Sequence, residues 1–83
     1  MTNISDTDFS ISKDDRIAMA EAYRVYEILE PQEKMKVPPY FVNSLLKFAD
    51  LSVVPPFEEK DSFSIDKLTQ KGKYIVMYMC TFN

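Results

Sequence analysis

Histidine and tryptophan are absent from this sequence of 83 residues, and cysteine and glycine occur once each, as Cys80 and Gly72. Without histidine, neither a Ser-His-Asp triad nor a Cys-His pair can form. A single cysteine excludes a disulfide within the chain and, together with the lack of histidine, the usual zinc sites. One glycine is too few for a glycine-rich phosphate loop. These absences predict a protein that is not an enzyme and carries no metal or other cofactor.

Long apolar segments are also missing. The longest unbroken apolar run covers Tyr74 to Cys80. That run is far shorter than the roughly 20 residues that a membrane-spanning helix needs. Residues 1–6 lack the basic and apolar regions of a signal peptide. We therefore expect a soluble, cytoplasmic protein that does not contact a membrane.

The composition is typical of a small globular domain. Hydrophobic residues make up 46% of the chain, aromatic residues 13% and charged residues 28%. The length fits one domain, because domains typically span roughly 50–250 residues. We predict a flexible N-terminal tail over residues 1–11 and a single helical domain over residues 12–83. Charge is uneven: residues 1–33 contain eight acidic and three basic residues, whereas residues 34–83 contain five and seven.

The clearest helix prediction covers residues 13–29. Ser12 and Asp15 form a pair that resembles a capping box, and acidic residues in a first turn suit the helix dipole. Apolar residues then recur at spacings of three and four, which is typical of a helix face packed on a core. This face contains Ala18, Ala22, Val25 and Leu29. Arg24 falls on another side of the helix and is expected outside the core.

A short helical turn is predicted near residues 31–36, where Pro31 can serve as a first helical residue. A second long helix is predicted over residues 38–50, because Pro38 and Pro39 suit a first turn that needs no N–H donors. Its apolar residues form one stripe that should be buried. The stripe consists of Phe41, Leu45, Phe48 and Ala49, and it is widened by Val42 and Leu46.

The C-terminal segment, residues 69–82, allows two interpretations. Its β-branched and aromatic residues favour a strand at residues 73–82, which would make the fold α+β. The spacing of its apolar residues, with Thr69 as a cap, favours a helix instead. Because nothing else in the sequence indicates a strand to pair with it, we predict a helix, and hence an all-α bundle of three main helices. The thiol of Cys80 is expected to be buried and inert, since free cysteine is among the most buried residue types.

Five segments of the sequence carry a resemblance to a known group of proteins. They are Ala22–Leu29, Lys36–Phe41, Leu45–Phe48, Pro55–Glu59 and Leu68–Lys71. Their order resembles short helical proteins of unknown function from Firmicutes, including clostridia, which combine a YxEVxEIL helix with a KIPxxxxxFL helix, a proline-acidic linker and a last helix. The chain departs from that pattern by a longer linker and by Gly72. The resemblance implies no catalytic residues, and the frequent placement of that group in mobile elements and prophages implies a phage-related role.

The chain has more aromatic and methionine residues than a small core can bury, which predicts an exposed apolar patch for a partner protein. The predicted patch consists of Val53, Val54, Phe57, Tyr74, Tyr78 and Phe82. For its loop residues, packing over an open end of the core is the structural alternative. We expect a non-catalytic protein–protein interaction protein that blocks a surface on a bacterial protein. An accessory or inhibitor protein of a phage or mobile element, of the anti-defence type, would fit this description.

Two other functions stay open at the level of sequence. The first is a small nucleic-acid-binding regulator that uses the lysine cluster of Lys67, Lys71 and Lys73. The acidic net charge of −3 and the lack of arginine beside these lysines argue against it. The second is a self-associating structural subunit, a homo-oligomer with the aromatic residues of the C-terminal helix at a symmetric interface.

Overall fold

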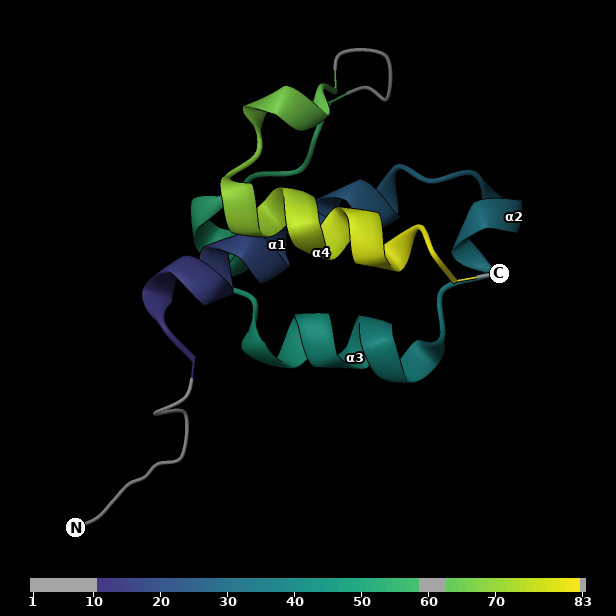
Figure 1. Ribbon diagram of the computed structural model, residues 1–83, viewed down its shortest axis with the longest axis horizontal. Helices are drawn as coiled ribbons and strands as arrows, with labels where there is room; N and C mark the ends of the chain where they lie inside the picture. Colours follow the sequence, from purple (N-terminus) through teal and green to yellow (C-terminus); the bar gives the residue numbers. More distant parts are fainter. Residues whose placement is uncertain (1–10, 59–62, 83) are drawn as a thin grey trace, which may run out of the picture.

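The computed structural model describes residues 11–58 and 63–82, which form four α-helices and two short 3₁₀ turns (Figure 1). The helices are α1 (Lys13–Glu27), α2 (Pro31–Lys34), α3 (Pro39–Phe48) and α4 (Gln70–Met79), and the turns are η3 (Leu51–Val53) and η5 (Ile65–Lys67). The prediction of a small all-α bundle is confirmed, and within the described residues no strand occurs. The alternative of a strand at residues 73–82 is wrong, because α4 occupies most of that segment. The predicted flexible tail lies, except for Ile11, outside the described residues.

Helix α1 begins where the sequence predicts and ends two residues earlier than residue 29. The Ser12 hydroxyl accepts a hydrogen bond from the backbone N–H of Asp15 at 3.1 Å. At the other end, the N–H of Ile28 bonds to the carbonyl of Val25 at 3.1 Å, so the last turn tightens. This tightening satisfies a carbonyl that the end of a helix would otherwise leave open.

Helix α3 is shorter at both ends than the predicted 38–50. Pro38 caps it in an extended conformation, and Ala49 is again extended, with ψ at 138°. The next residue, Asp50, turns its N–H to the carbonyl of Arg16 in α1 at 3.2 Å. A hydrogen bond to another element cannot also continue the helix, so this contact explains why α3 stops at Phe48.

Helix α4 stops at Met79 instead of continuing to residue 82. The Thr69 hydroxyl caps its start by accepting the backbone N–H of Gly72 at 3.0 Å. At its end, the N–H groups of Thr81 and Phe82 bond to carbonyls three residues earlier, at 3.0 and 3.3 Å. These shorter-range bonds form a closing turn. The strand propensity of the segment is therefore overridden by the cap and by packing on α1.

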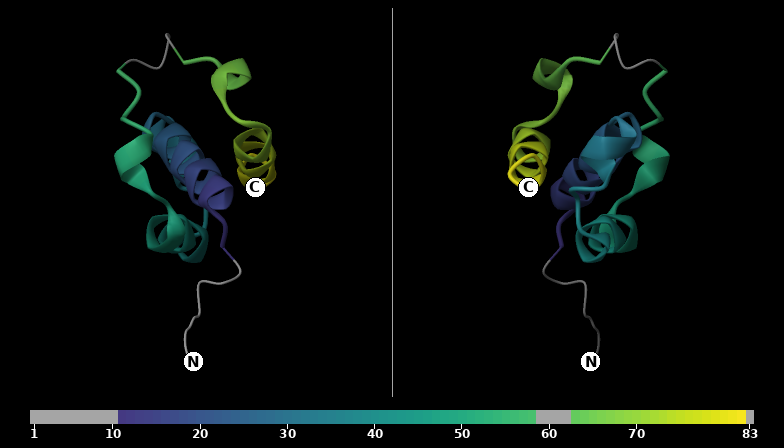
Figure 2. Two further views of the ribbon diagram at one scale, coloured as in Figure 1. Left: turned by 90° about the vertical axis from the view of Figure 1, so that its left-hand side faces the viewer. Right: turned by 90° about the vertical axis from the view of Figure 1, so that its right-hand side faces the viewer.

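The core lies along α1, which packs against both α3 and α4 (Figure 2). Its main cluster of buried side chains consists of Ala22, Val25, Val37, Leu45, Leu68, Val76 and Met79. Ala18 and Ala22 are fully buried, as their positions on the predicted face require. Small side chains at these positions let the neighbouring elements approach α1 closely. The first helix of the chain thus becomes the central element on which the others are placed.

The prediction that Cys80 is buried is wrong, because its side chain is exposed. It follows Met79, which faces the core, by one residue. Neighbouring residues at the end of a helix point in different directions, so Cys80 turns away from α1.

We expect Cys80 to react fully with Ellman's reagent in the native protein, because exposure gives the reagent direct access to the thiol. The rate should lie within about tenfold of that in the urea-unfolded chain. A Cys80→Ser variant supplies the blank. Strong protection in the native state, released only by urea, would show that the thiol is covered.

Candidate functional site

The structure divides the predicted apolar patch between two separate hollows. Val53, Val54 and Phe57 line a pocket of about 460 Å³ together with Phe63 and Leu68. The rings of Phe57 and Phe63 lie 4.9 Å apart between centroids, and both pack against the core. Phe57 therefore packs on the core, as the structural alternative predicts for the loop, whereas Val53 is 47% exposed.

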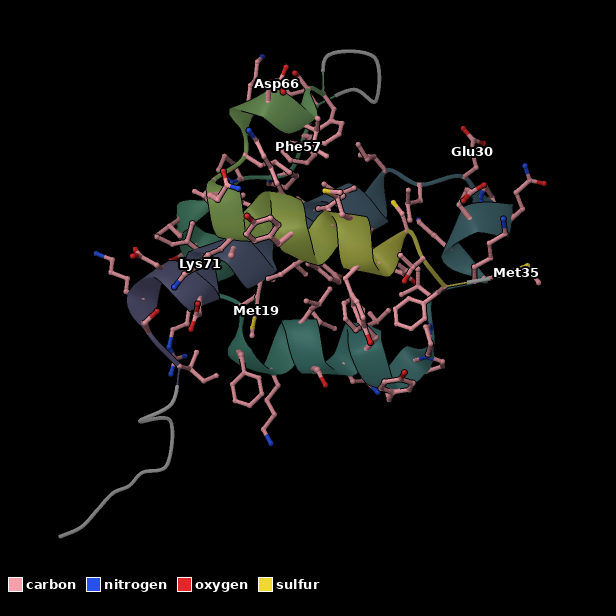
Figure 3. The ribbon with its side chains drawn as sticks, viewed as in Figure 1. Met19, Glu30, Met35, Phe57, Asp66 and Lys71 are labelled. Carbon is pink, nitrogen blue, oxygen red and sulfur yellow. The ribbon has the colours of Figure 1, made fainter. Side chains whose placement is uncertain are left out.

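The tyrosines of the patch line a second hollow, which we call the α3–α4 groove. It has a volume of about 270 Å³ and is almost entirely apolar. Its lining residues are Met19, Phe41, Ser44, Leu45, Tyr74, Ile75 and Tyr78. Met19 extends from α1 toward α3 (Figure 3). The groove is thus walled by α3 and α4 and based on α1.

The outer side of α4 is apolar as well. We call Tyr74, Met77 and Tyr78 the outer stripe, because their spacing places them together on one side of the helix. Their exposed fractions are 62%, 60% and 57%. Phe82 belongs to the aromatic cluster at the end of the groove: its ring lies 5.2 Å from that of Phe41 and 5.3 Å from that of Tyr78. Phe82 is half-buried there, whereas the outer stripe is open to solvent.

The three lysines of the nucleic-acid alternative do not share one face. Lys67 lies in η5 and lines the pocket with Val53. Lys71 and Lys73 are in the first turn of α4, but residues two apart on a helix point to nearly opposite sides. A phosphate backbone lying on one side of α4 would therefore meet one of these two lysines, not both.

Lys71 pairs with Asp15 at the start of α1, with 2.9 Å between its Nζ and Oδ1 of the carboxylate. This hydrogen bond lowers the pKa of Asp15 below its usual 3.8 and raises the pKa of Lys71 above its usual 10.5. Both groups lie at the surface, so the pair contributes little to the free energy of unfolding. Its structural effect is to tie the start of α4 to the start of α1.

Replacing Lys71 by methionine is expected to raise the pKa of Asp15 toward 3.8, because the hydrogen bond that stabilises its charged form is lost. A lowered acid pKa contributes stability above the unfolded value and loses it as the pH falls through the folded value. The variant and the wild type should therefore differ slightly at pH 7 and converge in acid. Carboxyl titration by NMR measures the shift, and an unchanged Asp15 would contradict the pairing.

Two charged-type side chains of α1, which the sequence did not place in the core, are buried. Glu21 is 7% exposed and accepts hydrogen bonds from the Thr69 N–H at 3.1 and 3.2 Å and from the Thr69 hydroxyl at 2.6 Å. In a capping box, a glutamate of the same helix bonds to the N–H of the capping residue. Here a glutamate of α1 performs that role for α4, whose own first turn has no acidic residue. The absence of an acidic residue from the first turn of α4 was the sequence feature that could have pointed to this contact.

Arg24 contradicts the prediction that it lies outside the core, since it is 9% exposed. Its Nε donates to the carbonyl of Val54 at 2.6 Å, and a terminal nitrogen donates to the carbonyl of Leu51 at 3.2 Å. The other terminal nitrogen contacts Glu27 at 3.0 Å. The buried guanidinium therefore fixes η3 and the start of the proline-rich loop onto α1.

Nowhere in the described part of the chain do three or more potential metal ligands gather. Within residues 11–58 and 63–82, no helix is both long enough and apolar enough to cross a membrane. The carboxylate of Glu21 is engaged by Thr69, so its contacts are those of a helix cap.

Comparisons with models of protein families, with curated proteins and with solved structures found no match to this chain. The resemblance to short Firmicutes proteins therefore stays a prediction.

Proposed function

We propose that this chain is a protein-binding protein that acts without catalysis and docks through the α3–α4 groove and the outer stripe. The observation that carries the proposal is that α4 is apolar on two sides. Its inner residues Gly72, Val76 and Met79 are buried against α1, yet Tyr74, Met77 and Tyr78 on its outer side stay exposed. A helix that is apolar nearly all round normally lies inside a larger packed unit.

The composition of the outer stripe supports a protein as the partner. Tyrosine and methionine are enriched in the cores of protein interfaces. The stripe continues into an apolar groove, so a partner would find one connected apolar surface instead of scattered side chains. Nucleic acid is the weaker candidate, because the lysines near this surface are few and diverge.

The mechanism we propose is steric: the chain covers a surface that its partner needs for another interaction. This is how a small accessory or inhibitor protein of a phage or mobile element would act, and we retain that role as part of the proposal. We propose this role because the sequence resembles proteins that are encoded in mobile elements.

The test is co-purification of the full tagged chain from nuclease-treated lysate of the cells that encode it, at moderate salt. The variant Tyr74→Ser with Met77→Ser removes two of the three residues of the outer stripe, both exposed, without touching the core. Val53→Ser is the matched control, because Val53 is 47% exposed and lines a different hollow, in the η3 turn that contacts α1. Circular dichroism confirms that both variants fold.

The proposal predicts one stoichiometric protein that is captured by wild type and by Val53→Ser but lost with the stripe variant. Equal capture by all three proteins would contradict docking at the stripe. A lane without any partner would contradict the proposed function.

A further inference from the structure

The pocket that Val53 and Phe57 line, which we call the loop pocket, is a second hollow of the molecule. It has a volume of about 460 Å³ and is walled by α1, by the loop after η3 and by η5 with its flanking residues. This loop and η5 lie on the side of α1 opposite to α3 (Figure 2). Pockets that bind small molecules typically measure roughly 300–1,000 Å³, so the volume suits a small organic ligand.

The walls of the loop pocket are mostly apolar, and the loop is tied in place. Ile17 of α1 lines the pocket together with Phe57 and Phe63, whose rings lie 4.9 Å apart between centroids. The buried guanidinium of Arg24 donates to the carbonyl of Val54, another lining residue. A wall that is fixed in advance lets a ligand bind without the cost of ordering the loop.

One charged side chain of the loop pocket is buried. Glu21 is 7% exposed and lines the pocket from α1. Its carboxylate accepts the N–H and the hydroxyl of Thr69, which are both neutral donors. Among residues 11–58 and 63–82, no basic side chain forms an ion pair with Glu21. This is unusual, because a buried glutamate is almost always paired with a positive charge.

The carboxylate of Glu21 also has acceptor capacity left. A carboxylate offers about four lone-pair sites, whereas Thr69 supplies two donors. A cation with an N–H group would fill a remaining site and provide the missing counter-charge. Such charge-assisted hydrogen bonds are roughly twice as strong as neutral ones. Aromatic rings such as those of Phe57 and Phe63 also attract organic cations.

The other charged side chains that line the loop pocket are exposed. They are Glu58 and Lys67. Because both are hydrated, each acts on a ligand only weakly, and their effects oppose each other: Glu58 favours a cationic ligand and Lys67 disfavours one. The buried charge of Glu21 therefore determines which charge a ligand should carry.

We propose that the loop pocket binds a small organic amine. Its apolar body lies against Ile17 and the phenylalanine rings, and its ammonium group donates a hydrogen bond to Glu21. A neutral ligand would leave Glu21 without a counter-charge, and an anionic ligand would be repelled by it. This inference is independent of the proposed function, because the loop pocket and the α3–α4 groove share no lining residue.

The test titrates the full chain with phenethylamine, phenethyl alcohol and phenylacetate, which share a phenyl group and differ in charge. Amide chemical shifts in the NMR spectrum measure each affinity and locate the site. We expect phenethylamine to bind with a dissociation constant of about 1 mM, which is typical of a ligand of this size. Its affinity should exceed that of phenethyl alcohol about tenfold, the effect of one hydrogen bond to a charged group. The shifts should occur at Ile17, Val54 and Phe63.

Two substitutions with opposite expected effects test the charge argument. Glu21→Gln keeps the shape of the side chain without its charge, so it should lower the affinity for phenethylamine about tenfold and leave that for phenethyl alcohol unchanged. Lys67→Met removes an exposed cation and should strengthen phenethylamine binding about twofold. Glu33→Gln and Lys73→Met make the same changes of charge outside the pocket and should have no effect. Circular dichroism checks that each variant folds.

Equal binding of the three probes, or tighter binding of phenylacetate, would overturn the inference. No binding well above the expected dissociation constant would mean that the pocket holds water only, and shifts confined to the α3–α4 groove would place the amine elsewhere. Either result would refute the proposal. If Glu21→Gln does not fold, Val53→Trp decides, because Val53 is 47% exposed and a larger side chain there narrows the pocket. It should abolish phenethylamine binding, and an unchanged affinity would contradict the site.

Discussion

Replacing Gly72 by alanine is expected to destabilise the protein by about 1–3 kcal/mol, the usual cost of forcing an atom into a filled site. Helix propensity alone predicts the opposite, since alanine is the better helix former by about 1 kcal/mol. A Cβ on Gly72 would overlap Oε1 of Glu21 and come within 3.2 Å of the Thr69 hydroxyl oxygen. Urea denaturation of wild type and variant measures the sign directly.

The overlap is difficult to relieve because Glu21 is held in place. Its carboxylate accepts the N–H and the hydroxyl of Thr69, and that hydroxyl in turn accepts the N–H of Gly72. Moving the carboxylate aside would break the cap of α4 and leave a buried charge with fewer hydrogen bonds. Either response destabilises the junction of α1 and α4.

A double-mutant cycle separates this explanation from a general effect of the substitution. In a Glu21→Ala background the obstructing carboxylate is gone, so Gly72→Ala should become neutral or stabilising. Glu21→Gln keeps the shape of the side chain and should keep the penalty. If Gly72→Ala stabilises the protein in every background, the close approach of Glu21 to α4 does not exist in solution.

The same contact shows what the sequence could not reveal. Local patterns were sufficient for the helices: Ser12 and Asp15 mark the start of α1, and Thr69 marks the start of α4. The sequence did not single out Glu21, because a periodicity argument identifies the apolar face of a helix and does not identify a buried polar residue. Its partner Thr69 is 48 residues away, and no local rule links the two.

The docking patch was divided for a related reason. Sequence identified which apolar side chains exceed the capacity of a small core, and Tyr74 and Tyr78 are indeed exposed. It could not tell that Val53 and Phe57 line a separate pocket with residues of α1, because their position follows from how the loop is tied to α1.

Replacing Arg24 by methionine is expected to destabilise the protein by about 1.5–3 kcal/mol, the range for hydrogen bonds made by a charged group. Methionine keeps much of the apolar volume of the arginine side chain, so the loss of stability measures the contribution of the guanidinium. Its nitrogens hold the carbonyls of Val54 and Leu51, two positions near the start of the proline-rich loop. Neither carbonyl gains a replacement donor from methionine.

Arg24→Lys should recover less than half of that loss. A lysine carries its positive charge on one nitrogen, whereas the planar guanidinium reaches Val54 and Leu51 with different nitrogens at once. Glu27→Gln is the control for the ion pair, because it weakens the contact to Arg24 and leaves both carbonyl bonds in place. Its effect should stay below about 1 kcal/mol, since Glu27 is exposed.

Native-state hydrogen exchange distinguishes a pinned loop from a general loss of packing around Arg24. If the guanidinium tethers the loop, Arg24→Met should accelerate exchange at the Val53 amide, which bonds to the carbonyl of Asp50 at 3.3 Å, more than exchange in α4. Uniform acceleration across α1 and α4 would instead mean that Arg24 supports the core as a whole. The loop-specific result would show that the buried guanidinium holds the start of the proline-rich loop against α1.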